Sequence, residues 1–231
     1  MKSAAPRAPV FSIITPSRGT RPLALAGAIA SVAEAIRVAA DTLPPDGLEM
    51  LVGFDGVHGE RVGPEGGPPP PWVRFFDLPY DGNFGNALRH ALLRAARGRF
   101  VLLLDDDNAL TPGALSTYLE GLDHEIQVGR IDVSRAFDKP FLPQQEPGRE
   151  IIRPGNIDPL CLCLSRELVV VRCQGWHCEG GYESDFLNIR RYFRRARSVR
   201  HTNDLVGVYD AGTGLDPDGL NSRQAHRDRV P

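Results

Sequence analysis

The sequence predicts an α/β fold in which a mostly parallel central sheet lies between two layers of helices. Two features of the first half lead to this prediction: short β-rich runs alternate with Ala- and Leu-rich segments, and residues 100–104 are continuously apolar. Alternating strands and helices are typical of parallel sheets covered on both faces. An apolar run of strand length is typical of a strand buried on both faces. We therefore expect a three-layer α/β/α sandwich.

The first half supplies the elements in order. Strands are expected at 10–15, 48–54, 72–76 and 100–104, where apolar, β-branched and aromatic residues cluster. Helices are expected at 22–40, which begins with a proline, and at 86–97, where apolar residues recur at helical spacing. A further helix is expected with Thr111 as N-cap and Pro112 in its first position. The Gly- and Pro-rich segment 56–71 is expected to be a surface loop.

The second half is less regular. Strands are expected at 130–137, 157–164 and 204–209, and a loop at 140–154. Tyr182, Phe186, Ile189 and Phe193 recur at the spacing of one helix face. We expect residues 1–231 to form one domain, with a first half at about 10–110, a second half at about 111–210 and a polar tail at 211–231.

Composition excludes several classes of protein. The net charge of −2 gives no basic field, so nucleic acid is not expected as a partner. No apolar stretch approaches the ~20 residues needed to cross a bilayer, and residues 1–9 lack the apolar core of a secretory signal, so a cytoplasmic protein is expected. The four cysteines, Cys161, Cys163, Cys173 and Cys178, do not have the usual C-x2-C spacing, which favours structural thiols over a zinc site with His177.

Polar clusters follow three of the expected strands. Thr15-Pro16-Ser17-Arg18 follows the first, Asp55 the second, and Asp105-Asp106-Asp107 the apolar run. Ligands of such sheets bind at the carboxyl ends of the strands. We therefore expect the three clusters to converge on one edge of the sheet.

The acidic run Asp105–Asp107 suggests a divalent ion. Three adjacent carboxylates repel one another unless a cation or solvent relieves the repulsion. Mg²⁺ or Mn²⁺ typically binds one or two carboxylates together with substrate phosphates. The alternative is a solvated acidic loop, or charges that complement the next helix N-terminus.

Four segments resemble family 2 glycosyltransferases of the GT-A fold. GNALRHALLRAARGRFVLLLDDDNALTPGAL resembles the central block of that family, and VFSIITPSRGTRPLALAGAIASV its first strand and nucleotide loop. LEMLVGFDG looks like the second strand with its base-contacting Asp, and GGYESDFLNIRRYF like the acceptor-side helix. The segments occur in the family order across residues 10–210. The resemblance therefore implies that the half at about 10–110 binds the nucleotide sugar and that the half at about 111–210 binds the acceptor. The resemblance implies a Rossmann-like GT-A fold and transfer of a sugar, with inversion, from a nucleoside-diphosphate sugar (a UDP-sugar is favoured) with Mn²⁺ or Mg²⁺.

The resemblance also implies roles for individual residues. Asp107 would be the metal ligand, supported by Asp105. The residues implied to bind the nucleotide sugar are Thr15, Pro16, Ser17, Arg18, Asp55, Asn86, Arg89, Asp105 and Asp106. Asp185 would be the base that takes the proton of the acceptor hydroxyl, with Glu183 in reserve.

The acceptor is expected to be a sugar, a lipid-linked molecule or another small molecule. Arg190–Arg197 form a basic cluster that is either a solvated helix face or a contact with an anionic membrane surface or a phosphate-bearing acceptor. His201 and His226 are weaker candidates for a further metal ligand, and Trp176 and Tyr182 for stacking on an acceptor sugar.

Two other functions stay open at this point. A nucleotidyltransferase that makes the sugar nucleotide usually has a Gly-rich loop after the first strand, whereas Thr15–Thr20 contains one glycine. A protein of the same fold that binds a sugar nucleotide without turning it over is the other alternative.

Overall fold

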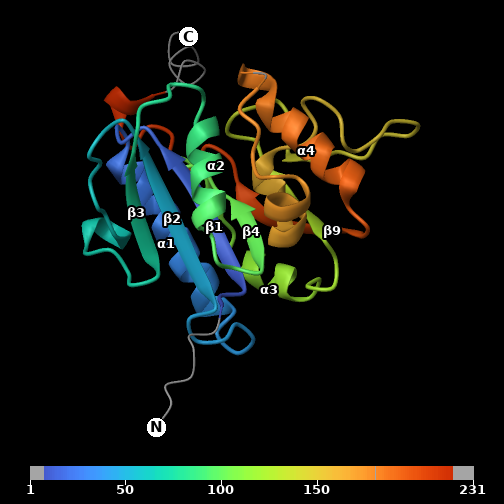
Figure 1. Ribbon diagram of the computed structural model, residues 1–231, viewed down its shortest axis with the longest axis horizontal. Coiled ribbons are helices and arrows are strands. Elements are labelled where there is room, and N and C mark those ends of the chain that lie inside the picture. The colour runs from blue at the N-terminus through green and yellow to red at the C-terminus, as the bar shows by residue number, and fades with distance from the viewer. Residues whose placement is uncertain (1–7, 180, 221–231) are drawn as a thin grey trace.

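The computed structural model describes residues 8–179 and 181–220, except for the side chain of Tyr182. Its strands form a single nine-stranded sheet in the order β3-β2-β1-β4-β8-β6-β9-β5, with β7 paired to β6 (Figure 1). The predicted α/β class with a mostly parallel central sheet is confirmed.

The strands predicted in the first half form the parallel part of this sheet. They are β1 (Phe11–Ser17), β2 (Leu48–Asp55), β3 (Val73–Leu78) and β4 (Phe100–Leu103). β1 lies in parallel between β2 and β4, and all seven of its residues are buried. The parallel register brings the carboxyl ends of β1, β2 and β4 to the same edge, as expected from the alternation in sequence.

The second half of the sheet is mixed. β8 (Leu162–Ser165) joins it antiparallel to both β4 and β6 (Ile126–Asp132), and β6 runs parallel to β9 (Val199–Val208). Two short strands, β5 (Ala109–Leu110) and β7 (Phe141–Leu142), pair antiparallel with β9 and β6.

Three strand predictions in this half were wrong in their limits. The strand expected at 130–137 begins at Ile126 because buried Gln127 satisfies its amide inside the protein, donating to Tyr118 O at 2.8 Å. The strand expected at 204–209 begins earlier, at Val199. The strand expected at 157–164 opens instead with a 3-10 turn, η2 (Pro159–Cys161), because Asp158 Oδ1 accepts the Leu160 amide at 2.9 Å.

Within the described residues, four α-helices cover the sheet. α1 (Pro22–Val38) and α3 (Ala114–Leu119) contact each other, and Figure 1 shows α1 behind the sheet with α2 (Asn86–Ala95) and α4 (Ser184–Arg195) in front of it. The helix expected from Thr111 begins later, because the Thr111 hydroxyl donates to Leu205 O instead of capping the helix. After β8 the chain forms a π-helix, η3 (Glu167–Arg172).

The remaining turns are 3-10 segments: η1 (Pro64–Gly66), η4 (Gly181–Glu183) and η5 (Pro217–Gly219). Segment 209–220 returns to the start of α1, where the Asp216 carboxylate accepts the amides of Leu23 at 3.2 Å and Ala24 at 2.8 Å. The described part of the polar tail is therefore anchored to a helix N-terminus; His226 lies outside the described residues. No helix in the described ranges is long and apolar enough to span a membrane.

Candidate active site

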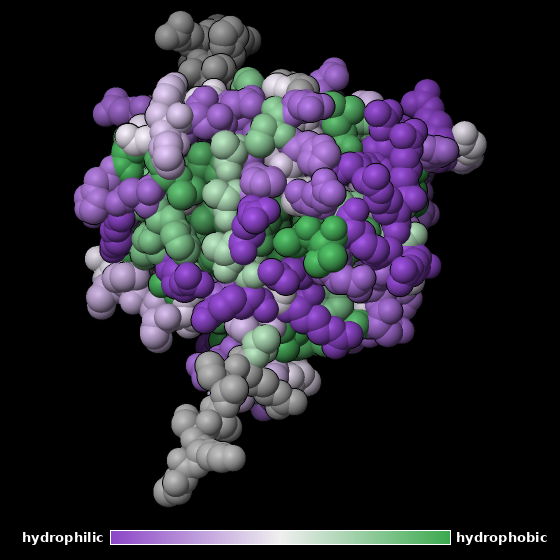
Figure 2. Space-filling view, viewed as in Figure 1, coloured by the Kyte–Doolittle hydropathy of each residue, from purple (hydrophilic) through white to green (hydrophobic). Residues whose placement is uncertain are grey.

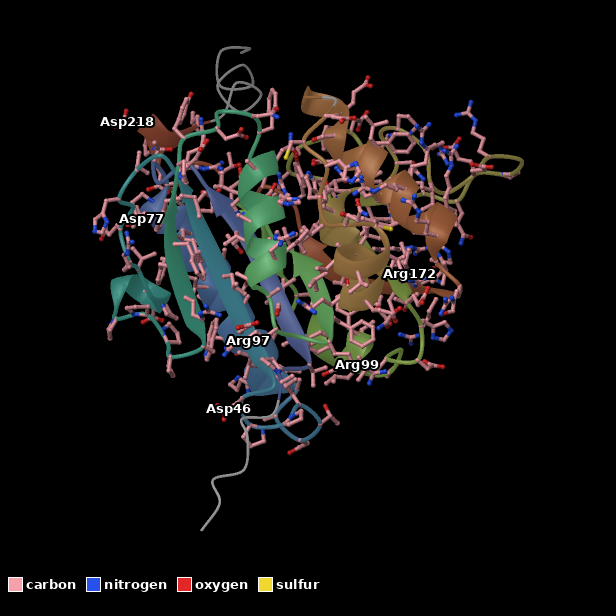
Figure 3. The ribbon with its side chains drawn as sticks, viewed as in Figure 1. Asp46, Asp77, Arg97, Arg99, Arg172 and Asp218 are labelled. Carbon is pink, nitrogen blue, oxygen red and sulfur yellow. The ribbon has the colours of Figure 1, made fainter. Side chains whose placement is uncertain are left out.

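The polar clusters predicted from the sequence converge on the carboxyl edge of the parallel strands. This edge is the upper one in Figure 3, where Asp218 of η5 is labelled, whereas Asp46, Arg97 and Arg99 mark the opposite edge. Ser17 from β1 and Asp106 after β4 meet there, with the Ser17 hydroxyl donating to Asp106 Oδ2 at 2.6 Å.

Arg21, which was not predicted as a site residue, offsets part of the negative charge of the acidic run. Its guanidinium forms ion pairs with both Asp106 and Asp107. Gly219 packs on it so closely that an added Cβ would lie 2.4 Å from Arg21 Cγ. Arg21 precedes Pro22, the first residue of α1, and the sequence pattern around it reads only as a helix start.

Burial changes the pKa values of Asp106 and of Arg21, which is paired with it. The Asp106 side chain is 1% exposed, and burial raises its pKa to about 7, although Arg21 acts in the opposite direction. For Arg21, burial lowers the pKa but the carboxylates of Asp106, Asp107 and Asp105 outweigh it, so the net pKa is raised. The pair is a charged unit that is held mostly away from water.

Arg89 makes a second ion pair with the same run. Its side chain is 4% exposed and donates to Asp105 Oδ1 at 2.6 Å and to Phe84 O at 2.8 Å. Its guanidinium lies 5.4 Å from the ring centre of Trp176. Although burial lowers its pKa, Asp105 and Asp185 raise it above the usual value, so Arg89 is a permanent cation in the site.

A group of three carboxylates surrounds Arg89. Asp185, in the first turn of α4, has its pKa raised by burial and lowered in part by Arg89. Burial raises the pKa of Asp158 to about 7, and the charges of Asp185 and Asp105 add to this effect. Asp158 was not among the residues predicted for the site. The sequence does indicate this turn, because Asp158-Pro159 has the form of an N-cap followed by a first-turn proline. The pair lies inside segment 157–164, which was interpreted as a strand.

Asn86 connects the two halves of the site from within the protein. Its Oδ1 accepts from Trp176 Nε1 at 2.8 Å and from Ser184 Oγ at 2.6 Å, and its Nδ2 donates to Asn83 Oδ1 at 3.3 Å. Asn86 is fully buried, so its amide joins α2 to the start of α4. Trp176 is 1% exposed and belongs to the core.

Asp55 holds the loop that follows β3. Its two carboxylate oxygens accept the amides of Asp81 at 2.7 Å and Gly82 at 3.0 Å. Asp55 remains half-exposed at the end of β2.

The remaining residues of the expected nucleotide pocket follow β1. Thr15 and Pro16 are buried, and Thr15 Oγ1 has no hydrogen-bond partner among the described residues. Arg18 is exposed and donates to Gly219 O at 2.7 Å. Glu183 is also exposed, directly before α4. Each of these residues lies at the carboxyl edge or directly beside it.

His201 and the four cysteines were the weaker candidates for metal binding. His201 pairs with Val128 in the first part of β9, seven residues before Val208, or about 20 Å along the strand from the acidic run's side of the sheet. Cys161, Cys163 and Cys173 are buried free thiols, and Cys178 is an exposed one.

The acidic run has side chains of the type that bind a divalent ion. Among the described residues, no three His, Cys, Asp or Glu side chains are grouped as a metal site. Mg²⁺ sites that also bind phosphates need only one or two carboxylates, however. Asp105 is 39% exposed, and Asp107 contacts Arg21. The residue types fit such an ion, provided that Arg21 releases Asp107.

Comparison with solved structures gives the same architecture. TarS of S. aureus, residues 1–349 in complex with UDP, superposes with a TM-score of 0.69 at 16% identity over 94% of this chain and 68% of that one. The same fragment with UDP-GlcNAc gives 0.68 at 16% identity over 86% and 58%. The mannosyltransferase PcManGT from Pyrobaculum calidifontis, in complex with GDP-Man and Mn²⁺, gives 0.55 at 15% identity over 97% and 66%.

The chain has the GT-A fold. No protein-family model and no curated protein matches the sequence. Within the GT-A fold, the carboxyl edge described above is the place where the strand ends, α2 and α4 bring their polar side chains together.

Proposed function

We propose that this GT-A chain transfers a sugar from a nucleoside-diphosphate sugar, with a UDP-sugar favoured, to a hydroxyl group of an acceptor, with inversion at the sugar. The observation that carries the proposal is the convergence of β1, β2, β4, α2 and α4 on one polar edge that contains two buried or half-buried arginines, Arg21 and Arg89. The acceptor would be a sugar, a lipid-linked molecule or another small molecule.

The donor would lie across the ends of β1, β2 and β4. Asp55 is proposed to accept a hydrogen bond from the base, beside the loop that it already holds at Asp81 and Gly82. The buried Thr15 hydroxyl, which lacks a partner among the described residues, would be satisfied by the nucleotide. Arg18 and Arg89 would supply positive charge to the diphosphate of the donor, because guanidinium groups bind phosphate oxygens through paired hydrogen bonds.

Mn²⁺ or Mg²⁺ is part of the proposal. Asp107 would be its principal protein ligand, with Asp105 in support, and donor phosphates would complete its coordination. When bound, such an ion offsets the negative charge on a leaving diphosphate. Arg21 pairs with Asp107 in the structure, so the guanidinium and the ion would compete for this carboxylate.

Asp185 is proposed as the base. In an inverting transfer, the acceptor oxygen attacks the anomeric carbon while the bond to the diphosphate breaks, and the hydroxyl proton passes to a carboxylate. Burial raises the pKa of Asp185, and a base whose pKa lies closer to the working pH removes a proton more effectively. Arg89 acts against the effect of burial and lowers the pKa of Asp185 in part, which favours the ionised form. Asp158 would position Arg89 and Asp185 by its charge.

Release of UDP or GDP from a panel of nucleotide sugars with Mn²⁺ tests this proposal, since water can replace an unidentified acceptor. We expect release by the wild type and a loss of roughly 100-fold in Asp185→Asn, within the range that general-base catalysis contributes. Asp41→Asn, at an exposed site in the turn after α1, is the matched control and should behave as wild type. Equal rates in Asp185→Asn and Asp41→Asn, or no release from any donor, would refute the assignment.

A further inference from the structure

A separate cavity of about 540 Å³ lies on the outer part of α4. Four arginines line it, Arg190, Arg191, Arg194 and Arg195, together with His177 and Glu179 from the preceding segment. Figure 2 shows hydrophilic side chains covering the part of the surface where Figure 1 draws α4. The volume falls in the range of small-molecule sites, roughly 300–1,000 Å³.

The charges that line this cavity are unbalanced. Four guanidinium groups face one carboxylate, Glu179, and none of the four forms an ion pair within the part of the chain that the structure describes. Arg191 Nη2 donates to Gly175 O at 2.6 Å and to Asn188 Oδ1 at 2.8 Å, which fixes that guanidinium in place. Its Nε is buried without a hydrogen-bond partner among the described residues.

A solvated helix face does not account for this arrangement. Arg194 and Arg195 lie in the last turn of α4, where positive charge complements the helix dipole. Arg190 and Arg191 lie one turn earlier, so each faces a like charge four residues on, which destabilises a helix. An anion between them would relieve that repulsion and would use the fork of donors that each guanidinium presents.

We propose that this cavity binds a phosphate-type oxyanion, carried by a phosphorylated small molecule or by a lipid headgroup. The site is distinct from the candidate active site. Asp185 lies in the first turn of α4, and the four arginines follow it by five to ten residues, which is about 8–15 Å along the helix axis. Binding there does not depend on whether the chain transfers sugars.

The test is a titration of the ¹⁵N-labelled protein with inorganic pyrophosphate, followed by the amide NMR signals. We expect shifts concentrated at 177 and 188–195, and binding about tenfold weaker or worse in Arg194→Ser/Arg195→Ser, because two charge-assisted contacts are lost. Arg37→Ser/Arg94→Ser is the matched control, since both residues lie in the last turns of helices α1 and α2. Glu179→Gln, at an exposed position, should bind more tightly than wild type because Glu179 is the only carboxylate among the described residues that line the cavity.

His177 gives a second measurement in the same titration. Partial burial and then Arg191 lower its pKa, and a bound anion should raise it again. Phosphatidylcholine vesicles with and without phosphatidylglycerol distinguish a lipid headgroup from a soluble phosphorylated molecule. Binding to the anionic vesicles only, lost in Arg194→Ser/Arg195→Ser, identifies a headgroup. Binding of pyrophosphate without binding to vesicles identifies a soluble ligand. No shift with pyrophosphate and no binding to anionic vesicles, or equal binding in the two double variants, would overturn the proposal. Donor turnover is measured separately, so its failure leaves this result intact.

Discussion

Replacing Arg21 by Gln tests the ion pair that dominates the acidic run. Glutamine keeps much of the side-chain length and removes the positive charge. Arg21 is 12% exposed, Asp106 1% and Asp107 10%, so the substitution leaves two nearly buried carboxylates without their cation. Breaking a buried pair by removing one partner costs about 3–5 kcal/mol. For a protein of this size, 1 kcal/mol corresponds to about 2–4 °C in Tm, which gives a fall of about 6–20 °C.

The same variant separates the two cations that compete for Asp107. Without Arg21, Mn²⁺ no longer has to displace a guanidinium, so it should bind more tightly and restore part of the lost stability. Mass action gives about 2.7 kcal/mol of stabilisation when the free ion is at 100 times its Kd. We therefore expect Mn²⁺ to raise the Tm of Arg21→Gln by more than that of the wild type.

Thermal unfolding followed by circular dichroism at pH 7, with and without Mn²⁺, measures both effects. Arg94→Gln is the control: Arg94 is exposed at the end of α2, and a surface substitution of this kind changes stability by only about 0.5 kcal/mol. If Arg21→Gln unfolds within about 1 kcal/mol of the wild type, the pair is not the buried unit described here. If Mn²⁺ shifts neither protein, Asp107 is not a metal ligand.

Three further predictions concern the surrounding framework. The folded-state pKa of Asp158 is about 7, against 3.8 for the free side chain, so between these pH values the folded state binds a proton that the unfolded state has lost. The free energy of unfolding should therefore fall as pH rises from about 4 to 7, by at most about 1.4 kcal/mol per pH unit. Urea unfolding of Asp158→Asn should show a flatter pH dependence than urea unfolding of the wild type. Asn86→Ala leaves Trp176 Nε1 and Ser184 Oγ without their acceptor. In the same assay the free energy of unfolding should fall by about 1–3 kcal/mol for each of these two groups. A fall below about 0.5 kcal/mol would show that Asn86 does not join α2 to α4. Asp216→Ala removes the two bonds to the start of α1 and should cost about 0.5–2 kcal/mol; faster proteolysis of segment 209–220 should accompany it, and unchanged proteolysis would count against this anchor.

Much of the parallel half was predictable because its signals are local. The apolar run at 100–104 can be buried only as a central strand, and the prolines and glycines around it mark the ends of helices and strands. Once β1, β2 and β4 are parallel, Ser17 and Asp106 must come to one edge. The convergence therefore follows from topology.

The second half was harder to predict because long-range hydrogen bonds decide its limits. Gln127 looks like a loop residue until its amide meets Tyr118 O, and only the folded protein brings these groups together. The role of Arg21 was hidden for the same reason. The sequence identifies it only as the residue before a helix, and its two carboxylate partners lie 85 and 86 positions away. Asp158 becomes important only through its burial near Arg89 and Asp185.

Calorimetric titration of the wild type with UDP-sugars and GDP-sugars, with and without Mn²⁺, tests the central claim most directly. A donor site at the carboxyl edge predicts one-to-one binding of at least one nucleoside-diphosphate sugar, competition by its free nucleoside diphosphate, and no binding of the corresponding free sugar. Absence of binding by every donor, with metal or without it, would contradict the claim that this edge holds a nucleotide sugar.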